Sequence, residues 1–166
     1  MVFMNDSLAP DTGFDEKFMH EAIKEARKAL ADDEVPVGCV IVFDGKIIGR
    51  GYNRTESLQD PTAHAEMLAV TSAAENLGSW RLNGVTIYST LEPCAMCAGA
   101  LVLARVDRLV FGAPDPKFGA CGSIFNIVSE PRTNHRMSVS MGLLQDDCAA
   151  IMQDFFRKKR KPTDGQ

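Results

Sequence analysis

Residues 85–104 read VTIYSTLEPCAMCAGALVLA, and the predicted fold depends mainly on this stretch. Its first six residues are rich in β-branched and aromatic side chains, which predicts a strand. Pro93 predicts the start of a helix that runs from about Cys94 to Ala104. The next strand is predicted at Val106 to Phe111. Strands that alternate with helices imply parallel strand pairs, with helices packed on the faces of the sheet.

The segments on either side extend this pattern. From Phe14 the apolar residues recur at gaps of three and four, which predicts a helix with Asp15 as its N-cap. The Asp44-Gly45 pair between apolar runs at 37–43 and 46–53 predicts a β-hairpin, and hence an antiparallel pair. The fold we predict is a three-layer α/β/α sandwich with a mixed five-stranded sheet. The other expected elements are a loop at 57–62, a helix at 63–77, a long loop at 112–122, a strand at 137–141 and a helix at 145–159.

The composition fits one globular domain. The 166 residues include 18 basic and 22 acidic side chains, for a net charge of −4, and 45% of them are hydrophobic. This apolar content excludes intrinsic disorder, and no apolar run approaches the roughly 18 residues of a membrane span. Residues 1–6 lack the features of a secretory signal, so we expect a cytoplasmic protein. We expect a leader at 1–13, a single domain at 14–161 and a tail at 162–166.

Three residues have the chemistry and placement of zinc ligands. His64 lies at the start of one predicted helix, and Cys94 and Cys97 lie at the start of the next. The dipole at a helix N-terminus favours the thiolate form that binds metal. One imidazole and two thiolates leave a fourth position of zinc open for water, which is the catalytic pattern rather than the structural one. We therefore predict one zinc ion per chain.

Glu66 follows His64 by two residues, close enough to reach a zinc-activated water without being a ligand. A carboxylate there can take a proton from water and pass it to a leaving nitrogen, so Glu66 is the predicted catalytic residue.

The other cysteines do not suggest disulfides. Five is an odd number, and the chain shows no secretion signal. Cys39 and Cys148 lie in apolar patterns and are expected in the core. Two interpretations of Cys121 remain: a fourth zinc ligand, which would close the site, or a small buried residue.

The motifs together resemble a known family. His64-Ala65-Glu66 with Pro93-Cys94-Ala95-Met96-Cys97 is typical of zinc nucleobase deaminases. Over about 14–160, the chain resembles the bacterial tRNA-specific adenosine deaminases, within the cytidine deaminase-like superfamily. The residues that carry this resemblance beyond the zinc motif include Glu34-Val35-Pro36-Val37-Gly38, Gly51-Tyr52-Asn53-Arg54, the segment from Gly112 to Ser123, Asn134-His135-Arg136 and Asp154-Phe155-Phe156-Arg157.

The resemblance implies an activity and partners. The family converts adenosine to inosine at the wobble position of a tRNA anticodon, usually of an arginine tRNA, and works as a homodimer. Asn53 matches a residue that binds the target base, and Asp115 matches one that contacts the RNA backbone. Lys117, beside Asp115, is a further candidate RNA contact. So is Phe156, because an aromatic face can stack on a base while its neighbour packs in the core.

Some features leave alternatives open. Pro114 and Pro116 flank Asp115 and are expected to stiffen its loop, and Tyr52 stands where many relatives have tryptophan. The basic run at 157–161 could bind tRNA phosphates or only keep the chain in solution. His135 could contact RNA or be a surface or core histidine, and Trp80 has no assigned role.

Two other functions compete with tRNA deamination. The first is a deaminase of free bases or nucleosides, which would share the zinc motif. The second is a non-catalytic, zinc-stabilised RNA-binding module, although such a module would not need Glu66.

Overall fold

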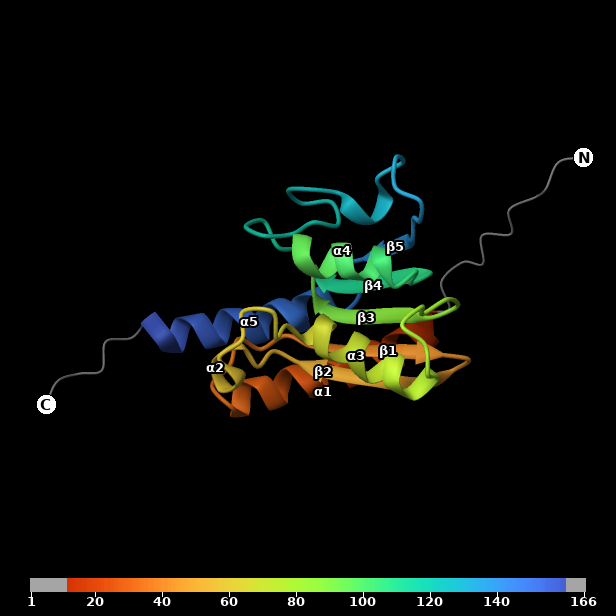
Figure 1. Cartoon of the computed structure of the whole chain (residues 1–166). Helices are drawn as coiled ribbons and strands as arrows, with labels where there is room; N and C mark the ends of the chain where they lie inside the picture. The colour runs from red at the N-terminus through yellow and green to blue at the C-terminus, as the bar shows by residue number, and fades with distance from the viewer. Residues whose placement is uncertain (1–11, 161–166) are drawn as a thin grey trace, which may run out of the picture.

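The computed structural model describes residues 12–160 and forms a five-stranded sheet with helices on both faces (Figure 1). The strand order is β2-β1-β3-β4-β5, with β1 antiparallel to both β2 and β3, and β3-β4-β5 parallel. This mixed α/β/α sandwich confirms the predicted fold class. The elements are α1 (Thr12–Ala31), β1 (Gly38–Phe43), β2 (Lys46–Tyr52), α2 (Thr55–Leu58), α3 (Ala65–Leu77), β3 (Thr86–Leu91), α4 (Ala95–Leu103), β4 (Arg108–Ala113), the 3₁₀ turn η1 (Ile127–Ser129), β5 (Ser138–Met141) and α5 (Gln145–Arg160).

Each face of the sheet has its own hydrophobic core. Alternate residues of a strand point to opposite faces, so Val40 and Val42 pack towards α1 and α5. Cys39 and Ile41 instead pack towards α3 and α4. Because both faces are covered, strand β1 is a nearly continuous apolar run.

Strand directions bring the helix starts together. Since β1 is antiparallel to both of its neighbours, β2 and β3 run in the same direction and end at the same edge of the sheet. Helices α3 and α4 follow these two strands, so both begin near that edge. Ligand sites of α/β folds are commonly found outside the carboxyl ends of such strands.

Helix α3 lies unusually close to β2. A Cβ atom added to Gly51 would come within 2.2 Å of the Ala65 carbonyl oxygen, and one added to Gly49 would come within 2.5 Å of the Ala69 carbonyl oxygen. Glycine at these two positions is what permits the close approach. The first turn of α3 is thereby held against the end of β2.

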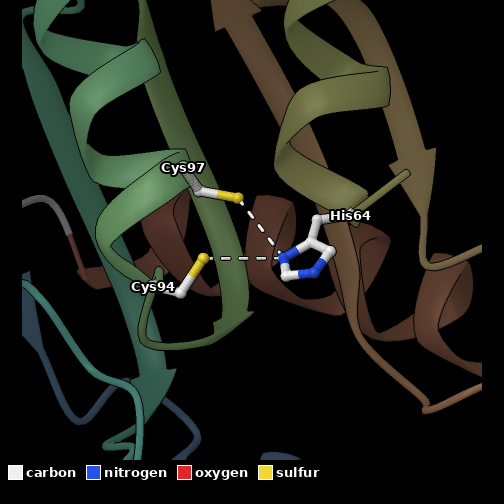
Figure 2. Close-up of side chains that lie close together, drawn as sticks. All are labelled: His64, Cys94 and Cys97. Carbon is white, nitrogen blue, oxygen red and sulfur yellow. Dashed lines mark hydrogen bonds between the residues drawn. The ribbon is translucent and has the colours of Figure 1, made fainter. Parts of the chain in front are cut away.

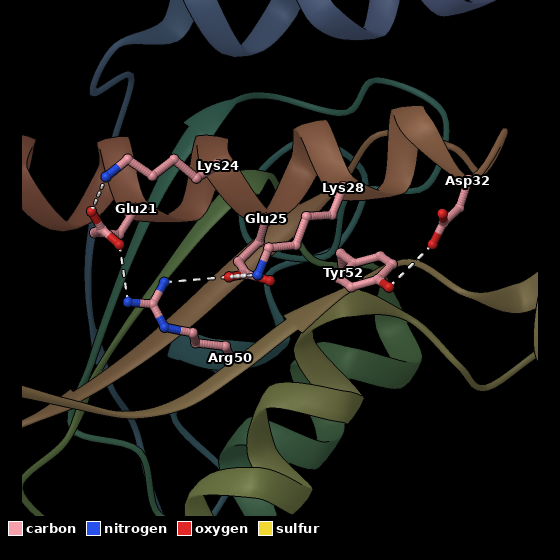
Figure 3. Close-up of polar contacts among 7 residues, drawn as sticks. All are labelled: Glu21, Lys24, Glu25, Lys28, Asp32, Arg50 and Tyr52. Atoms are coloured by element: carbon pink, nitrogen blue, oxygen red, sulfur yellow. Dashed lines mark hydrogen bonds and ion pairs between the residues drawn. The ribbon is translucent and has the colours of Figure 1, made fainter.

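Helix α1 lies on the face of the sheet opposite to α3, and polar contacts join it to the outer strand β2 (Figure 3). The Arg50 guanidinium donates to Glu21 at 2.9 Å and to Glu25 at 3.3 Å. At the far end of the helix, the Tyr52 hydroxyl donates to Asp32 at 3.1 Å. The aromatic residue at position 52 therefore helps to hold the α1–β1 connection.

Some local expectations were wrong. Helix α1 begins at Thr12, so Asp15 lies in its first turn and is not the N-cap. Asp15 is buried and accepts hydrogen bonds from Arg108 and Tyr88. A loop is expected at 57–62 from the sequence, but the first two of these residues, Ser57 and Leu58, form the end of the one-turn helix α2. Most of the expected leader and all of the expected tail lie outside the described residues. Within residues 12–160, we find no helix with the length and apolar character required to span a membrane.

Candidate active site

The three predicted metal ligands converge at the starts of α3 and α4 (Figure 2). His64 is the N-cap of α3, Cys94 is the N-cap of α4, and Cys97 lies in the first turn of α4. The Sγ atoms of Cys94 and Cys97 each lie 3.6 Å from Nδ1 of His64. All three ligand atoms lie within 4.8 Å of one another, so one ion could contact all of them.

The electrostatics of this cluster suit a cation. A hydrogen bond from Cys97, followed by one with His64, lowers the pKa of Cys94 to about 3. The same Cys94 contact, together with burial, raises the pKa of Cys97. The negative charge of one thiolate thus disfavours ionisation of the second thiol. A divalent cation between the two sulfurs would offset the repulsion between their charges. One imidazole nitrogen and two thiolate sulfurs form a donor set that fits zinc.

Glu66 lies beside the cluster but is not one of its members. The side chain belongs to the first turn of α3, is 4% exposed, and accepts a hydrogen bond from Cys97 Sγ at 3.5 Å. Burial raises the pKa of Glu66, because a charged carboxylate loses its hydration there. A carboxylate whose pKa is raised in this way is a better proton donor and acceptor in catalysis than an exposed one that stays ionised.

A cavity of about 370 Å³ opens onto this cluster. Its walls include His64, Cys94 and Glu66, together with the predicted substrate residues Asn53 and Asp115. Its volume is within the range of small-molecule sites. One pocket is therefore lined by members of the ligand cluster, by Glu66 and by the two predicted substrate residues.

Asn53 and Asp115 reach the pocket from the ends of different strands. Asn53 lies just beyond the end of β2, is 6% exposed, and has its Nδ2 3.5 Å from Thr55 Oγ1. Asp115 follows β4, and its Oδ1 accepts the backbone N–H groups of Lys117 at 2.9 Å and Phe118 at 3.2 Å. Asp115 therefore also shapes its own loop.

Two other candidates do not line this pocket. Lys117 is exposed on the Asp115 loop, whereas Phe156 lies on α5 and is 40% exposed. The neighbouring Phe155 is buried, which settles which of the two aromatics packs in the core. Their rings form an edge-on pair at 5.3 Å.

The basic cluster, which is the basic run at 157–161, forms ion pairs with acidic side chains of the same chain at two of its residues. Arg157 pairs with Asp154, and Lys159 Nζ lies 2.6 Å from Asp33 Oδ2 and 5.4 Å from the Phe155 ring centroid. Lys158 is exposed. Lys161, the last residue of the cluster, lies outside the described residues.

Cys121 is a buried residue and does not belong to the ligand cluster. It is 2% exposed, and the converging group contains only His64, Cys94 and Cys97 among residues 12–160. His135 also has a structural contact, since its Nε2 donates to the Val106 carbonyl oxygen at 2.6 Å.

Sequence reasoning assigned no role to two buried carboxylates, Glu34 and Glu92, or to the aromatic residue Phe118. Glu34 accepts the backbone N–H groups of Glu56 and Ser57, and thus anchors α2. Glu92 anchors the loop after β4, and Phe118 lines the pocket mouth. The position of Glu92, directly before Pro93-Cys94, was the available signal, whereas nothing local distinguished Phe118.

The family that matches this chain and the similar relatives named below are all deaminases. The MafB19-like deaminase family matches residues 14–160. A tRNA-specific adenosine deaminase of Bacillus subtilis is 52% identical over 147 residues, which cover 89% of this chain and 91% of that protein. The protein of the same name from Haemophilus influenzae is 47% identical over 149 residues, with 89% and 86% covered.

Solved structures give the same picture. A structure from a study of A-to-I editing by tRNA:A34 deaminases at the wobble position has a TM-score of 0.79 and 48% identity, covering 81% of this chain and 98% of that one. A guanine deaminase from Nitrosomonas europaea has a TM-score of 0.75 at 26% identity, covering 89% and 84%. The tRNA-directed relatives are thus far more similar in sequence than the free-base deaminase.

Proposed function

This chain belongs to the MafB19-like deaminases and to the tRNA-specific adenosine deaminases, and from that premise we propose how its own residues act. The reaction is the hydrolytic conversion of adenosine to inosine at the wobble position of a tRNA anticodon. Water adds to C6 of adenine and ammonia leaves, so that adenosine and water become inosine and ammonia. The observation that carries the proposal is the convergence of His64, Cys94 and Cys97 beside the buried Glu66.

Each of these residues has a distinct role in the proposed mechanism. His64, Cys94 and Cys97 would hold one zinc ion, which supplies the Lewis acidity that activates water. The Glu66 carboxylate accepts a proton from water and passes it to the nitrogen that leaves C6. Asn53, on the wall of the same pocket, binds and orients the base. The buried position of Glu66 keeps bulk water from competing for this proton.

The two competing functions are less well supported. A free-base deaminase would share the zinc cluster, but the guanine deaminase is 26% identical to this chain, against 52% for the tRNA-directed relative. A structural zinc module would gain nothing from a buried carboxylate beside its ligands, because burial of an unpaired charge is costly.

We further propose the partners that the family resemblance implies. The substrate is an arginine tRNA with adenosine at the wobble position, and the working unit is a homodimer in the cytoplasm. Large apolar side chains that are exposed in a single chain support self-association, among them Leu103 at 73% and Phe125 at 57%. Sedimentation of the purified chain at micromolar concentration tests the dimer.

A substrate panel tests the activity. We expect an unmodified arginine tRNA transcript to acquire inosine at its wobble position, as measured by sequencing, while free guanine, cytosine and adenosine release little ammonia. If a free base released ammonia at a rate comparable to that of the tRNA transcript, the proposal of a tRNA substrate would be wrong. Failure of every substrate with zinc-loaded protein would contradict deamination itself.

A metal measurement tests the ligand assignment separately. We expect about one zinc per chain in the wild type and strong loss of zinc in Cys94→Ala, since a three-residue site loses a third of its protein ligands. Cys148→Ala is the control, because Cys148 is a free cysteine that is buried in the core on the opposite face of the sheet, away from the ligand cluster. Retention of zinc by Cys94→Ala would overturn the assignment.

A further inference from the structure

A buried carboxylate accepts several hydrogen bonds from the loop between β4 and η1. Glu92 is 2% exposed and accepts backbone N–H groups from Asp115 at 2.8 Å, Cys121 at 3.0 Å and Ser123 at 3.0 Å. It also accepts the Ser123 hydroxyl. Hydrogen bonds to a charged acceptor are stronger than neutral ones. The loop is therefore a defined structure, although much of it is exposed.

The backbone around Phe118 is fixed by the same arrangement. Asp115 accepts the N–H group of Phe118 through its side chain, and that of Gly119 at 2.9 Å through its carbonyl oxygen. A Cβ atom on Gly119 would lie 2.4 Å from the Glu92 carboxyl carbon, so the chain passes directly against this anchor. Phe118 is thus presented from a rigid turn.

The Phe118 side chain is exposed at the pocket mouth. It is 69% exposed, yet it lines the same cavity as His64 and Glu66. An aromatic ring of the core would be covered by other side chains, as Phe111 is at 1% exposure. Phe118 instead offers its ring to whatever occupies the entrance.

A polynucleotide substrate places a base at this entrance. When the target adenosine enters the cavity, its two neighbours remain attached through the backbone and must lie near the pocket mouth. Aromatic faces stack on unpaired bases with little regard to sequence. On the basis of the proposed function, we propose that Phe118 forms a stacking subsite for a nucleotide directly adjacent to the target adenosine.

Substitution at position 118 measures the stacking. We expect Phe118→Ala and Phe118→Leu to lower kcat/KM for an anticodon stem-loop by roughly 5- to 150-fold, mostly through KM, because loss of one stacked base has this effect. Phe118→Trp keeps an aromatic face and should remain close to wild type. Equal activity of the Leu and Trp variants would show that stacking is not involved.

Removal of the partner base is the sharper test. We prepare two stem-loops, one abasic before the target adenosine and one abasic after it. The effect of Phe118→Ala should disappear on one of them, since the stacking partner is then already absent. An undiminished effect on both abasic substrates would overturn the proposal.

Two controls separate stacking from other effects of an exposed aromatic. Trp80 is also exposed, at 64%, but lies beyond the C-terminal end of α3, so Trp80→Ala should leave kcat/KM unchanged. Phe118→Ala must sediment as the wild type does, because dissociation of an assembly would make Phe118 an interface residue and overturn the subsite. An inactive wild type would instead contradict the proposed function, so the two failures are distinguishable.

Discussion

Glu66 and Asp15 are both buried carboxylates, but their surroundings give them opposite properties. Asp15, at 3% exposure, accepts two hydrogen bonds from Arg108 at 2.8 and 2.7 Å and one from the Tyr88 hydroxyl at 2.7 Å. Burial opposes ionisation of Asp15, yet these donors outweigh it, and the pKa of Asp15 is lowered. Glu66 has no cationic partner of this kind, and burial raises its pKa.

The difference shows that burial alone does not define a reactive carboxylate. A buried carboxylate with a bidentate guanidinium is held as a permanent anion and stabilises the fold. A buried carboxylate with few donors is instead easier to protonate than an exposed one, because burial disfavours its charged form. The proposed active site is therefore the region where the scaffold leaves a buried carboxylate without a guanidinium partner.

Glu66→Gln breaks the active-site side of this comparison and has the largest expected effect. Glutamine keeps the shape but cannot accept the proton, so we expect deamination to fall about 10²- to 10⁴-fold. Zinc content and melting temperature should remain close to wild type. Single-turnover inosine formation in the tRNA transcript gives the measurement.

The matched control is Glu75→Gln, on the exposed side of the same helix α3, which should keep full activity. Near-normal turnover by the Glu66 variant would mean that another group carries the proton.

Asp15→Asn breaks the scaffold side. It removes the charge that faces Arg108, and we expect a loss of about 3 kcal/mol in the free energy of unfolding. This estimate is at the low end for a broken buried pair, because the Arg108 side chain remains 24% exposed. Urea unfolding measures it, while activity per folded molecule should stay unchanged. A stable but inactive variant would contradict the separation of the two roles.

The pH dependence of that loss sharpens the comparison. Since the pKa of Asp15 is lower in the folded state, its ionised form stabilises the fold above the unfolded-state value near 4. The contribution disappears as pH falls through the lower folded-state pKa. The difference in unfolding free energy between wild type and Asp15→Asn should therefore be constant from about pH 7 to 5 and shrink below about pH 4. A difference that grows on acidification would reverse the assigned direction.

Exposed charges give the smallest expected effect. Lys158 is exposed on the last turn of α5, whereas Arg157 is paired with Asp154. If the basic cluster contacts tRNA phosphates, Lys158→Ala should reduce the slope of log affinity against log salt by about one. Arg157→Ala should reduce it less. Filter binding across a salt series measures both, and unchanged slopes would indicate a cluster that only keeps the chain in solution.

The sequence by itself determined the features that depend on local spacing. Alternating strands and helices predicted the mixed sandwich, because periodicity of apolar residues reports which face of each element is buried. The ligand candidates and Glu66 were identified from residue types at helix starts, where the backbone itself favours thiolates.

Only the tertiary structure decided the features that depend on distant partners. Asp15 and Arg108 are 93 residues apart, so the sequence pattern suggested a local N-cap rather than a buried ion pair. The anchoring of the Asp115 loop by Glu92 and the exposure of Phe118 also arise from packing across elements. Local patterns record the chain's own periodicity, whereas the partner of a buried charge and the covering of a ring depend on which segments the sheet brings together.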